Sequence, residues 1–322
     1  MLLARKRAER LVRESLGERA SDFYVVSLSA RTICYKGMFM AHQLFAYYPD
    51  LSKENLKSAL AIVHQRYSTN TFPNWQLAQP FRYVAHNGEI NTLSGNRNWM
   101  RARRKQMASD FFGADTDDMF PILPEQASDS ACFDSSLELL VNCGRSIPHS
   151  MMMMIPEAFG LKYHISTDKR AFYEYHASIM EPWDGPAAMV FTDGRLIGGT
   201  LDRNGLRPCR YLVTTDGLAI IASETGVVQF PPGKIRKKGR LRPGRMFLVD
   251  TGEGREISDN EVKSRVARRK PYRRWLEDNR IELRGLFDTP TLVESDPQTM
   301  RQRMRAFGYT REDLGMILTP MA

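Results

Sequence analysis

Four residues of this sequence carry groups that suit the binding of a free amino acid. Arg66 follows the segment ALAIVHQ, Asn87 and Gly88 form an Asn-Gly turn in AHNGE, and Asp129 lies between two serines. A guanidinium binds a carboxylate through two parallel hydrogen bonds, and a carboxylate binds an ammonium group. A side-chain amide and a glycine N–H can both donate to a carbonyl oxygen that becomes negative. Together these groups predict an amino-acid site with the oxyanion chemistry of amide hydrolysis.

Each of these residues alone has a more common explanation. An arginine after a strand is usually a surface ion-pair partner, Asn-Gly is usually only a turn, and an aspartate between serines is usually a helix cap. Spacing along the sequence does not place the four groups near one another. The residues by themselves therefore leave both interpretations open.

The helices that would position these residues are predicted from apolar spacing and end signals. Residues 1–20 and 134–144 have helical patterns that end near a glycine. Residues 51–60 are predicted to form a short helix with Ser52 as its N-cap. A further helical pattern at residues 306–322 has Thr310 as its predicted N-cap.

The strands are predicted from strand-favouring residues and from turn signals. Residues 23–39 favour strand, and residues 59–69 (ALAIVHQRYST) predict a buried strand that runs into a loop. Met151–Met154 are predicted as another buried strand, because methionine fills cores readily. The pairs Asp193-Gly194 and Asp216-Gly217 predict two hairpins, because a tight turn needs positive φ. Antiparallel strands with helices before and between them predict an α+β fold.

Composition favours a cytoplasmic protein that does not bind nucleic acid. The formal charge of +9 is concentrated between Lys234 and Arg245 and between Lys263 and Arg274, without the interleaved aromatic residues that stack bases. The four cysteines lie far apart and form no CxxC pair, so neither a metal site nor a disulfide framework is indicated. The chain has no long apolar run and no signal-peptide pattern at its start.

Long strings of the sequence closely resemble the large subunit of glutamate synthase. These strings are ICYKGMFMAHQLFAYYPDL, VHQRYSTNTFPNWQLAQPFRYVAHNGEINTLSGNRNWM, SDSACFDSSLELLVNCGRSIPHSMMMMIPEAF and MEPWDGPAAMVFTDGRLIGGTLDRNGLRPCRY. In that family they belong to the class II glutamine amidotransferase domain, which has the N-terminal-nucleophile hydrolase fold. The resemblance therefore implies a partial four-layer αββα sandwich with two antiparallel sheets.

The resemblance also implies a role for each of the four residues. The arginine of HQR(Y/F)ST, here Arg66, binds the glutamine carboxylate, and the aspartate of SDS, here Asp129, binds the substrate amino group. Asn87 and Gly88 of HNGE form the oxyanion hole. The stretch DRNGLRP, residues 202–208, is assigned a structural role at the edge of the site.

The resemblance divides the chain and implies the chemistry of a larger parent enzyme. Residues 1–270 are expected to be a partial amidotransferase domain, residues 271–295 a linker and residues 296–322 the start of a central domain. The parent would make glutamate from glutamine and 2-oxoglutarate. No cofactor is expected in this chain, whereas FMN and an iron–sulfur cluster are expected in the rest of the parent. The expected partners are the rest of that chain and a small electron-donating subunit or ferredoxin.

One departure from the family concerns the nucleophile. Such amidotransferases resemble one another in using an amino-terminal cysteine, whereas this chain starts Met1-Leu2-Leu3. Its four internal cysteines fit packing positions better than a catalytic one. The chain is therefore expected to be a fragment that binds glutamine weakly at most and does not hydrolyse it. The alternatives are a non-catalytic glutamine-sensing or partner-binding module and, less favoured, a basic nucleic-acid binder.

Overall fold

The computed structural model describes residues 1–66, 72–110, 112–124, 127–281 and 296–321. They form two compact units, Met1–Asp278 and Asn279–Ala322. The helix α8 (Tyr272–Asn279) extends the first unit into the residues predicted as a linker. The second unit contains α9 (Pro297–Ala306) and a further helical segment, residues 311–318. Thr310 precedes this segment, and its hydroxyl accepts from the N–H of Asp313 at 3.1 Å. This bond confirms Thr310 as a helix N-cap.

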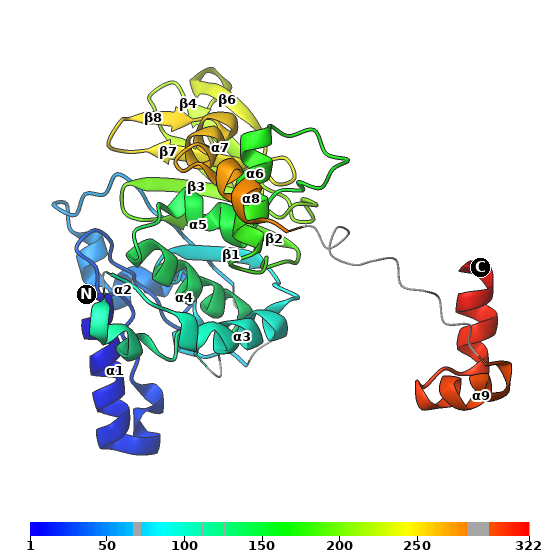
Figure 1. Ribbon diagram of the computed structural model, residues 1–322. Coiled ribbons are helices and arrows are strands. Elements are labelled where there is room, and N and C mark those ends of the chain that lie inside the picture. The colour runs from blue at the N-terminus through cyan, green and yellow to red at the C-terminus, as the bar shows by residue number, and fades with distance from the viewer. Residues whose placement is uncertain (67–71, 111, 125–126, 282–295, 322) are drawn as a thin grey trace. The chain divides into compact units, whose positions relative to one another are not determined.

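The first unit is built around two antiparallel sheets (Figure 1). The five-stranded sheet has the order β1-β2-β3-β7-β8, and the three-stranded sheet has the order β5-β4-β6. The bounds are β1 Val84–Gly88, β2 Ala187–Thr192, β3 Leu196–Leu201, β4 Arg210–Thr214, β5 Ala219–Ala222, β6 Ile235–Arg240, β7 Met246–Asp250 and β8 Arg255–Ile257. The predicted α+β class with two antiparallel sheets is therefore confirmed.

Both predicted hairpins are present. The first joins β2 to β3 through Gly194 at φ 89°, and the second joins β4 to β5 through Gly217 at φ 91°. A side chain strains this backbone conformation, so glycine is the residue that permits these turns.

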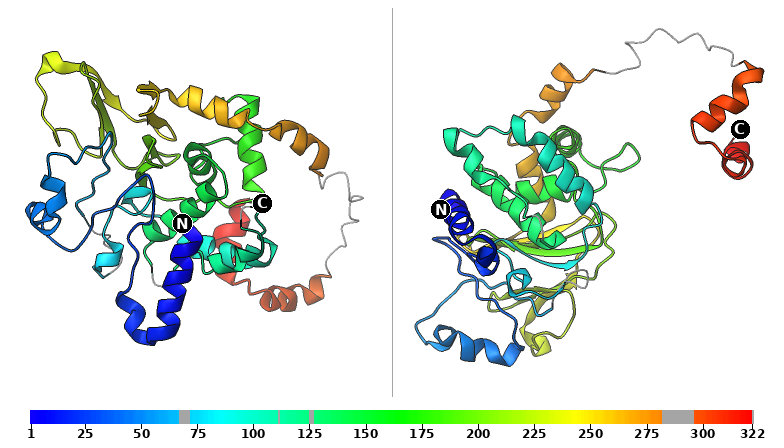
Figure 2. Two further views of the ribbon diagram at one scale, coloured as in Figure 1. Left: turned by 90° about the vertical axis from the view of Figure 1, so that its left-hand side faces the viewer. Right: turned by 90° about the horizontal axis from the view of Figure 1, so that it is seen from below.

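Helices cover one face of the five-stranded sheet, as Figures 1 and 2 show. They are α4 (Asp129–Asn142), α5 (Ile147–Met154), α6 (Thr167–Ala177) and α7 (Asp259–Ala267). Their buried side chains share one core with those of the sheet, around Phe133, Phe172 and Phe191. Besides α8, the other α-helices described in the first unit are α1 (Leu2–Leu16), α2 (Leu44–Tyr47) and α3 (Leu93–Ala102).

The second core lies between the two sheets and includes Leu201, Val213 and Phe247. The sheets approach closely there, because a Cβ on Gly199 of β3 would lie 2.5 Å from the Cδ1 atom of Ile221 of β5. The described residues thus form a helical layer and two sheet layers. The complete four-layer order stays a prediction.

Two predicted strands are absent from the structure. Residues 23–39 and 59–66 are described, but they belong to no strand and to neither sheet. Val63 is 81% exposed, so this part of the predicted buried strand is wrong. Residues 67–69 lie outside the described residues.

Two other local predictions were also wrong. Residues 53–60 are not helical; the Ser58 hydroxyl instead donates to the carbonyl of Leu60 at 2.6 Å, and such local bonds compete with a helix. Met151–Met154 are buried as predicted but belong to helix α5. Four apolar residues in a row cannot distinguish strand from buried helix by periodicity. The helix predicted at 134–144 begins earlier, at Asp129.

Candidate functional site

Strand β1 is at the edge of its sheet, and its backbone amides alternate between the neighbouring strand and the open edge. Toward β2, the carbonyl of Tyr83 accepts from Thr192 and the N–H of Glu89 donates to Pro186, both at 2.9 Å. Residues with even numbers therefore face the open edge.

Side chains from outside the sheet accept most of these outward N–H groups. The N–H of Val84 donates to Asp134 Oδ1 at 3.1 Å, and the N–H of His86 donates to Gln79 Oε1 at 2.6 Å. Beyond the strand, the N–H of Ile90 donates to Asp129 Oδ2 at 2.7 Å. The Gly88 amide lies in the middle of this row.

Gly88 supplies the remaining outward amide of this row. Gly88 is paired in register with Ala187 of β2. The N–H of Ala187 donates to Asp202 Oδ1 at 3.1 Å, and its carbonyl accepts from the N–H of Asp202 at 3.0 Å. Neither backbone group of Ala187 therefore binds Gly88, and the Gly88 N–H points to the open edge. Among the described residues, no acceptor is seen for this N–H. Gly88 has φ 151°, and a Cβ there would lie 1.9 Å from the Pro186 carbonyl oxygen. The exposed Asn87 precedes it and adds a side-chain amide.

Asp129 is brought beside the end of β1 by its bond from Ile90. It is the first residue of α4, and the preceding Ser128 is the N-cap, accepting from the N–H of Ala131 at 3.2 Å. The other carboxylate oxygen of Asp129 accepts from the Ser130 hydroxyl at 3.3 Å. This oxygen keeps lone pairs that can accept from an ammonium group.

The ring of His86 lies next to Gly88 and links strand β1 to helix α4. Its Nδ1 atom is 2.8 Å from the Ser130 hydroxyl and 3.9 Å from Asp129 Oδ2. Burial lowers the pKa of His86 to about 4, although the Asp129 carboxylate raises it. The ring is therefore neutral at pH 7. Sequence reasoning did not single out His86 or Ser130, although both lie within the quoted strings AHNGE and SDS.

Arg66 lies in the extended segment near β1, but the structure does not show its guanidinium joining the other three residues. Its backbone N–H donates to the Nδ1 atom of His64 at 3.2 Å, and the side chain is exposed. The His64 ring is close to the backbone of His86. Burial lowers the pKa of His64, and the contact with the His86 backbone opposes this shift. The structure thus brings Asn87, Gly88 and Asp129 together, and the Arg66 segment reaches β1 through His64.

The DRNGLRP stretch supports the same edge. The buried Asp202 accepts from the N–H groups of Ala187 and Leu206 at 3.1 Å and from that of Asn204 at 2.9 Å. These bonds fix the start of β2, which is opposite Gly88.

One apolar cavity in the described part of the chain lies away from these residues. It has a volume of about 600 Å³ and is lined mainly by apolar side chains, and none of Arg66, Asn87, Gly88 and Asp129 contributes to its wall. Within the same ranges, no three His, Cys, Asp or Glu side chains gather as a metal site requires. None of the helices described is both long and apolar enough to cross a membrane.

Comparison with known proteins gives one family. A model of the class II glutamine amidotransferases matches residues 1–275. The NADPH glutamate synthase large chain of Bacillus subtilis (strain 168) is 50% identical over 300 residues, which are 93% of this chain and 20% of that protein. The corresponding protein of Azospirillum brasilense is 47% identical over 325 residues, 100% of this chain and 21% of its own.

A plant relative extends the same similarity. The chloroplastic ferredoxin-dependent glutamate synthase 2 of Arabidopsis thaliana is 44% identical over 329 residues, 100% of this chain and 20% of its own. The chain therefore spans about a fifth of the length of the curated relatives it matches.

Proposed function

Because this chain belongs to the class II glutamine amidotransferases, we propose that it binds L-glutamine at the end of strand β1. Asp129 holds the ammonium group, and Arg66 holds the carboxylate. The side-chain carbonyl oxygen accepts from the Gly88 N–H and the Asn87 amide. These roles follow the family resemblance.

The observation that carries the proposal is the shared edge of Gly88 and Ile90. The Gly88 amide points to the same side as the Ile90 amide that binds Asp129. Two residues of extended chain separate these amides, about 7 Å. That spacing is similar to the reach of an extended glutamine from its ammonium group to its side-chain oxygen. The edge therefore presents the Gly88 N–H and the Asp129 carboxylate on one side, two residues apart along the chain.

This 322-residue chain should bind glutamine without hydrolysing it. Burial raises the pKa of Cys34 and of Cys209 to about 11, and it also raises the pKa of Cys132 and Cys143. The thiolate is the nucleophile, so none of these thiols is activated for attack at neutral pH.

The larger protein that contains this domain is proposed to act as a glutamate synthase. It would release ammonia from glutamine, pass it to 2-oxoglutarate and reduce the product with electrons delivered through FMN and an iron–sulfur cluster outside this chain. Residues 296–322 would begin the domain that follows the amidotransferase domain. The relatives include NADPH-, NADH- and ferredoxin-dependent enzymes, so similarity alone does not select the electron donor.

Calorimetric titration with L-glutamine and L-glutamate tests the proposal. We expect saturable binding of glutamine, and a loss of affinity of about tenfold or more in Asp129→Asn and in Arg66→Ala, because each removes a charge-assisted contact. The site would be refuted if the wild-type chain did not bind glutamine, or if both variants bound glutamine as tightly as the wild-type chain does. Release of glutamate from glutamine by the purified chain would refute the proposed lack of hydrolysis.

A further inference from the structure

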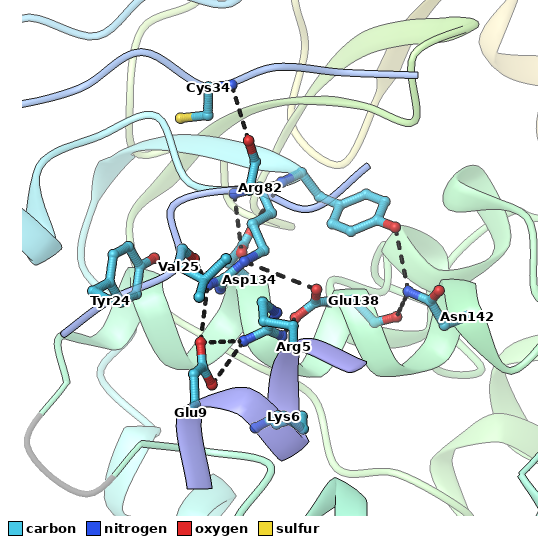
Figure 3. Close-up of polar contacts among 12 residues, drawn as sticks. Arg5, Lys6, Glu9, Tyr24, Val25, Cys34, Arg82, Asp134, Glu138 and Asn142 are labelled. Atoms are coloured by element: carbon cyan, nitrogen blue, oxygen red, sulfur yellow. Dashed lines mark hydrogen bonds and ion pairs between the residues drawn. The ribbon is translucent and has the colours of Figure 1, made fainter. Parts of the chain in front are cut away.

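Asp134 is a buried carboxylate that binds the backbone at the beginning of β1. It is 1% exposed, and its Oδ1 atom accepts from the N–H groups of Tyr83 and Val84 at 2.8 and 3.1 Å. Its Oδ2 atom accepts from the N–H of Arg82 at 3.2 Å. Figure 3 shows Asp134 between Arg82 and the helix that carries it. A single side chain thus accepts three consecutive amides.

Helix α4 contacts the β1 segment at three places. Asp134 binds the start of the strand, Ser130 meets the ring of His86 in its middle, and Asp129 binds Ile90 beyond its end. Asp129 and Asp134 belong to the same helix, which is a rigid connection between them. The two ends of the strand are therefore held by one element.

We propose that Asp134 is a positioning residue for the glutamine site: its carboxylate fixes β1 on helix α4, so that Asn87 and Gly88 stand at a set place relative to Asp129. This inference rests on the proposed function for its substrate. In this proposal Asp134 does not contact the substrate and acts on the site through strand β1.

The charges around Asp134 indicate that its main contribution is to hold the backbone of residues 82–84 in place. It forms no ion pair within 4 Å among the described residues, whereas Glu138, one turn later in α4, pairs with Arg5 of α1 and lies 3.9 Å from Arg82. Burial raises the pKa of Asp134 to about 6, although attraction to Arg82 opposes the shift. Folding thus disfavours the ionised form of Asp134. A carboxylate at this buried position is therefore better explained by its hydrogen bonds from three backbone amides than by a gain in the stability of the fold.

An amide variant separates positioning from simple packing. In Asp134→Asn the side chain keeps its size but has one acceptor oxygen, and its NH2 group cannot accept from a third N–H. Glu138→Gln is the matched control, because Glu138 belongs to the same helix and the same buried network but accepts from none of the three backbone amides of residues 82–84.

The position of Gly88 can be read by NMR in the full 322-residue chain. Asn-Gly occurs twice in the sequence, at 87–88 and 204–205. A sample labelled with ¹³C at asparagine carbonyls and ¹⁵N at glycine therefore gives one linked signal for Gly88 and one for Gly205. Gly205, in the turn of DRNGLRP, is the internal reference for correct folding.

We expect Asp134→Asn to move the Gly88 signal by more than its linewidth and leave Gly205 in place, while Glu138→Gln moves neither. An unmoved Gly88 signal in folded Asp134→Asn would overturn the inference, and so would an equal shift in Glu138→Gln. If Asp134→Asn does not fold, Asp134→Ser, which has an acceptor oxygen and little bulk, is compared by the same criteria.

Glutamine titration of the same variants provides the functional readout. Affinity should fall about two- to thirtyfold in Asp134→Asn, the range typical of residues that couple through a network, and should not change in Glu138→Gln. An unchanged affinity in Asp134→Asn would contradict the positioning role. If the wild-type chain binds no glutamine, the proposed function fails, yet the Gly88 signal still decides whether Asp134 fixes the strand.

Discussion

The two segments that carry the proposed site are held in very different ways. Strand β1, with Asn87 and Gly88, is paired along its length with β2 and is held on its open edge by α4 and Gln79. The segment 59–66, with Arg66, pairs with no strand of the described structure, and Val63 within it is 81% exposed.

This difference separates what the fold preorganises from what binding must order. The Gly88 N–H and the Asp129 carboxylate are held by backbone contacts, so their arrangement costs little when glutamine binds. The carboxylate contact from Arg66 requires an exposed side chain to be ordered, which costs about 1.5–2 kcal/mol of rotamer freedom. Substitutions in β1 should therefore change both stability and binding, whereas substitutions at Arg66 should change binding alone.

The largest effect should come from adding one methyl group in β1. Gly88→Ala places a Cβ 1.9 Å from the Pro186 carbonyl and 2.8 Å from the His86 Nε2 atom, at φ 151°. We expect a loss of about 4 kcal/mol in the free energy of unfolding and no measurable glutamine binding. Denaturant unfolding and calorimetry measure the two quantities.

Gly217→Ala is the control for backbone strain without a clash. Gly217 has φ 91°, and nothing lies within 4 Å of its added Cβ. This variant should lose about 1 kcal/mol and keep its glutamine affinity. Equal losses in the two variants would show that Gly88 is only a turn residue.

A smaller effect is expected from protonation of His86 alone, whose ring lies next to Gly88. The pKa of His86 in the folded chain is about 4, below its ordinary value of 6.5, so its contribution to stability is complete above pH 6.5 and is lost as the pH falls to 4. Between pH 7 and pH 5 this loss is about 2 kcal/mol. Burial likewise lowers the pKa of His149 to about 3 and of His176 to about 4, so these residues add losses in the same direction.

Ring NMR distinguishes His86 from the other histidines during this titration. The ring of His86 should still be neutral at pH 5, and unfolding curves at pH 7 and pH 5 should show the chain less stable at pH 5. A His86 ring that titrates near pH 6.5 would show that β1 does not bury it as described.

Local signals in the sequence predicted those elements whose cause is itself local. The hairpins form because Gly194 and Gly217 permit their turns, and α1 ends at Gly17, as the pattern indicated. Residues 59–66 have a strand composition, but a strand also needs a neighbouring backbone, which composition does not reveal. The four-methionine run failed for a related reason, since burial alone does not select helix or strand.

The site itself could be predicted only in part. Asn87, Gly88 and Asp129 were chosen by chemistry and by family resemblance, and the bond between Ile90 and Asp129 brings them together. The roles of Arg66, Asn87, Gly88 and Asp129 all stay predictions. The sequence did not reveal the positioning role of Asp134, because the partners of Asp134 are backbone amides about fifty residues earlier in the chain.

The most direct test of the glutamine site is the NMR signal of Gly88 during titration with L-glutamine. We expect a saturable shift of this signal, no shift of Gly205, and loss of the response in Asp129→Asn. A Gly88 signal that does not respond to glutamine, or that responds equally in Asp129→Asn, would contradict binding at the end of β1.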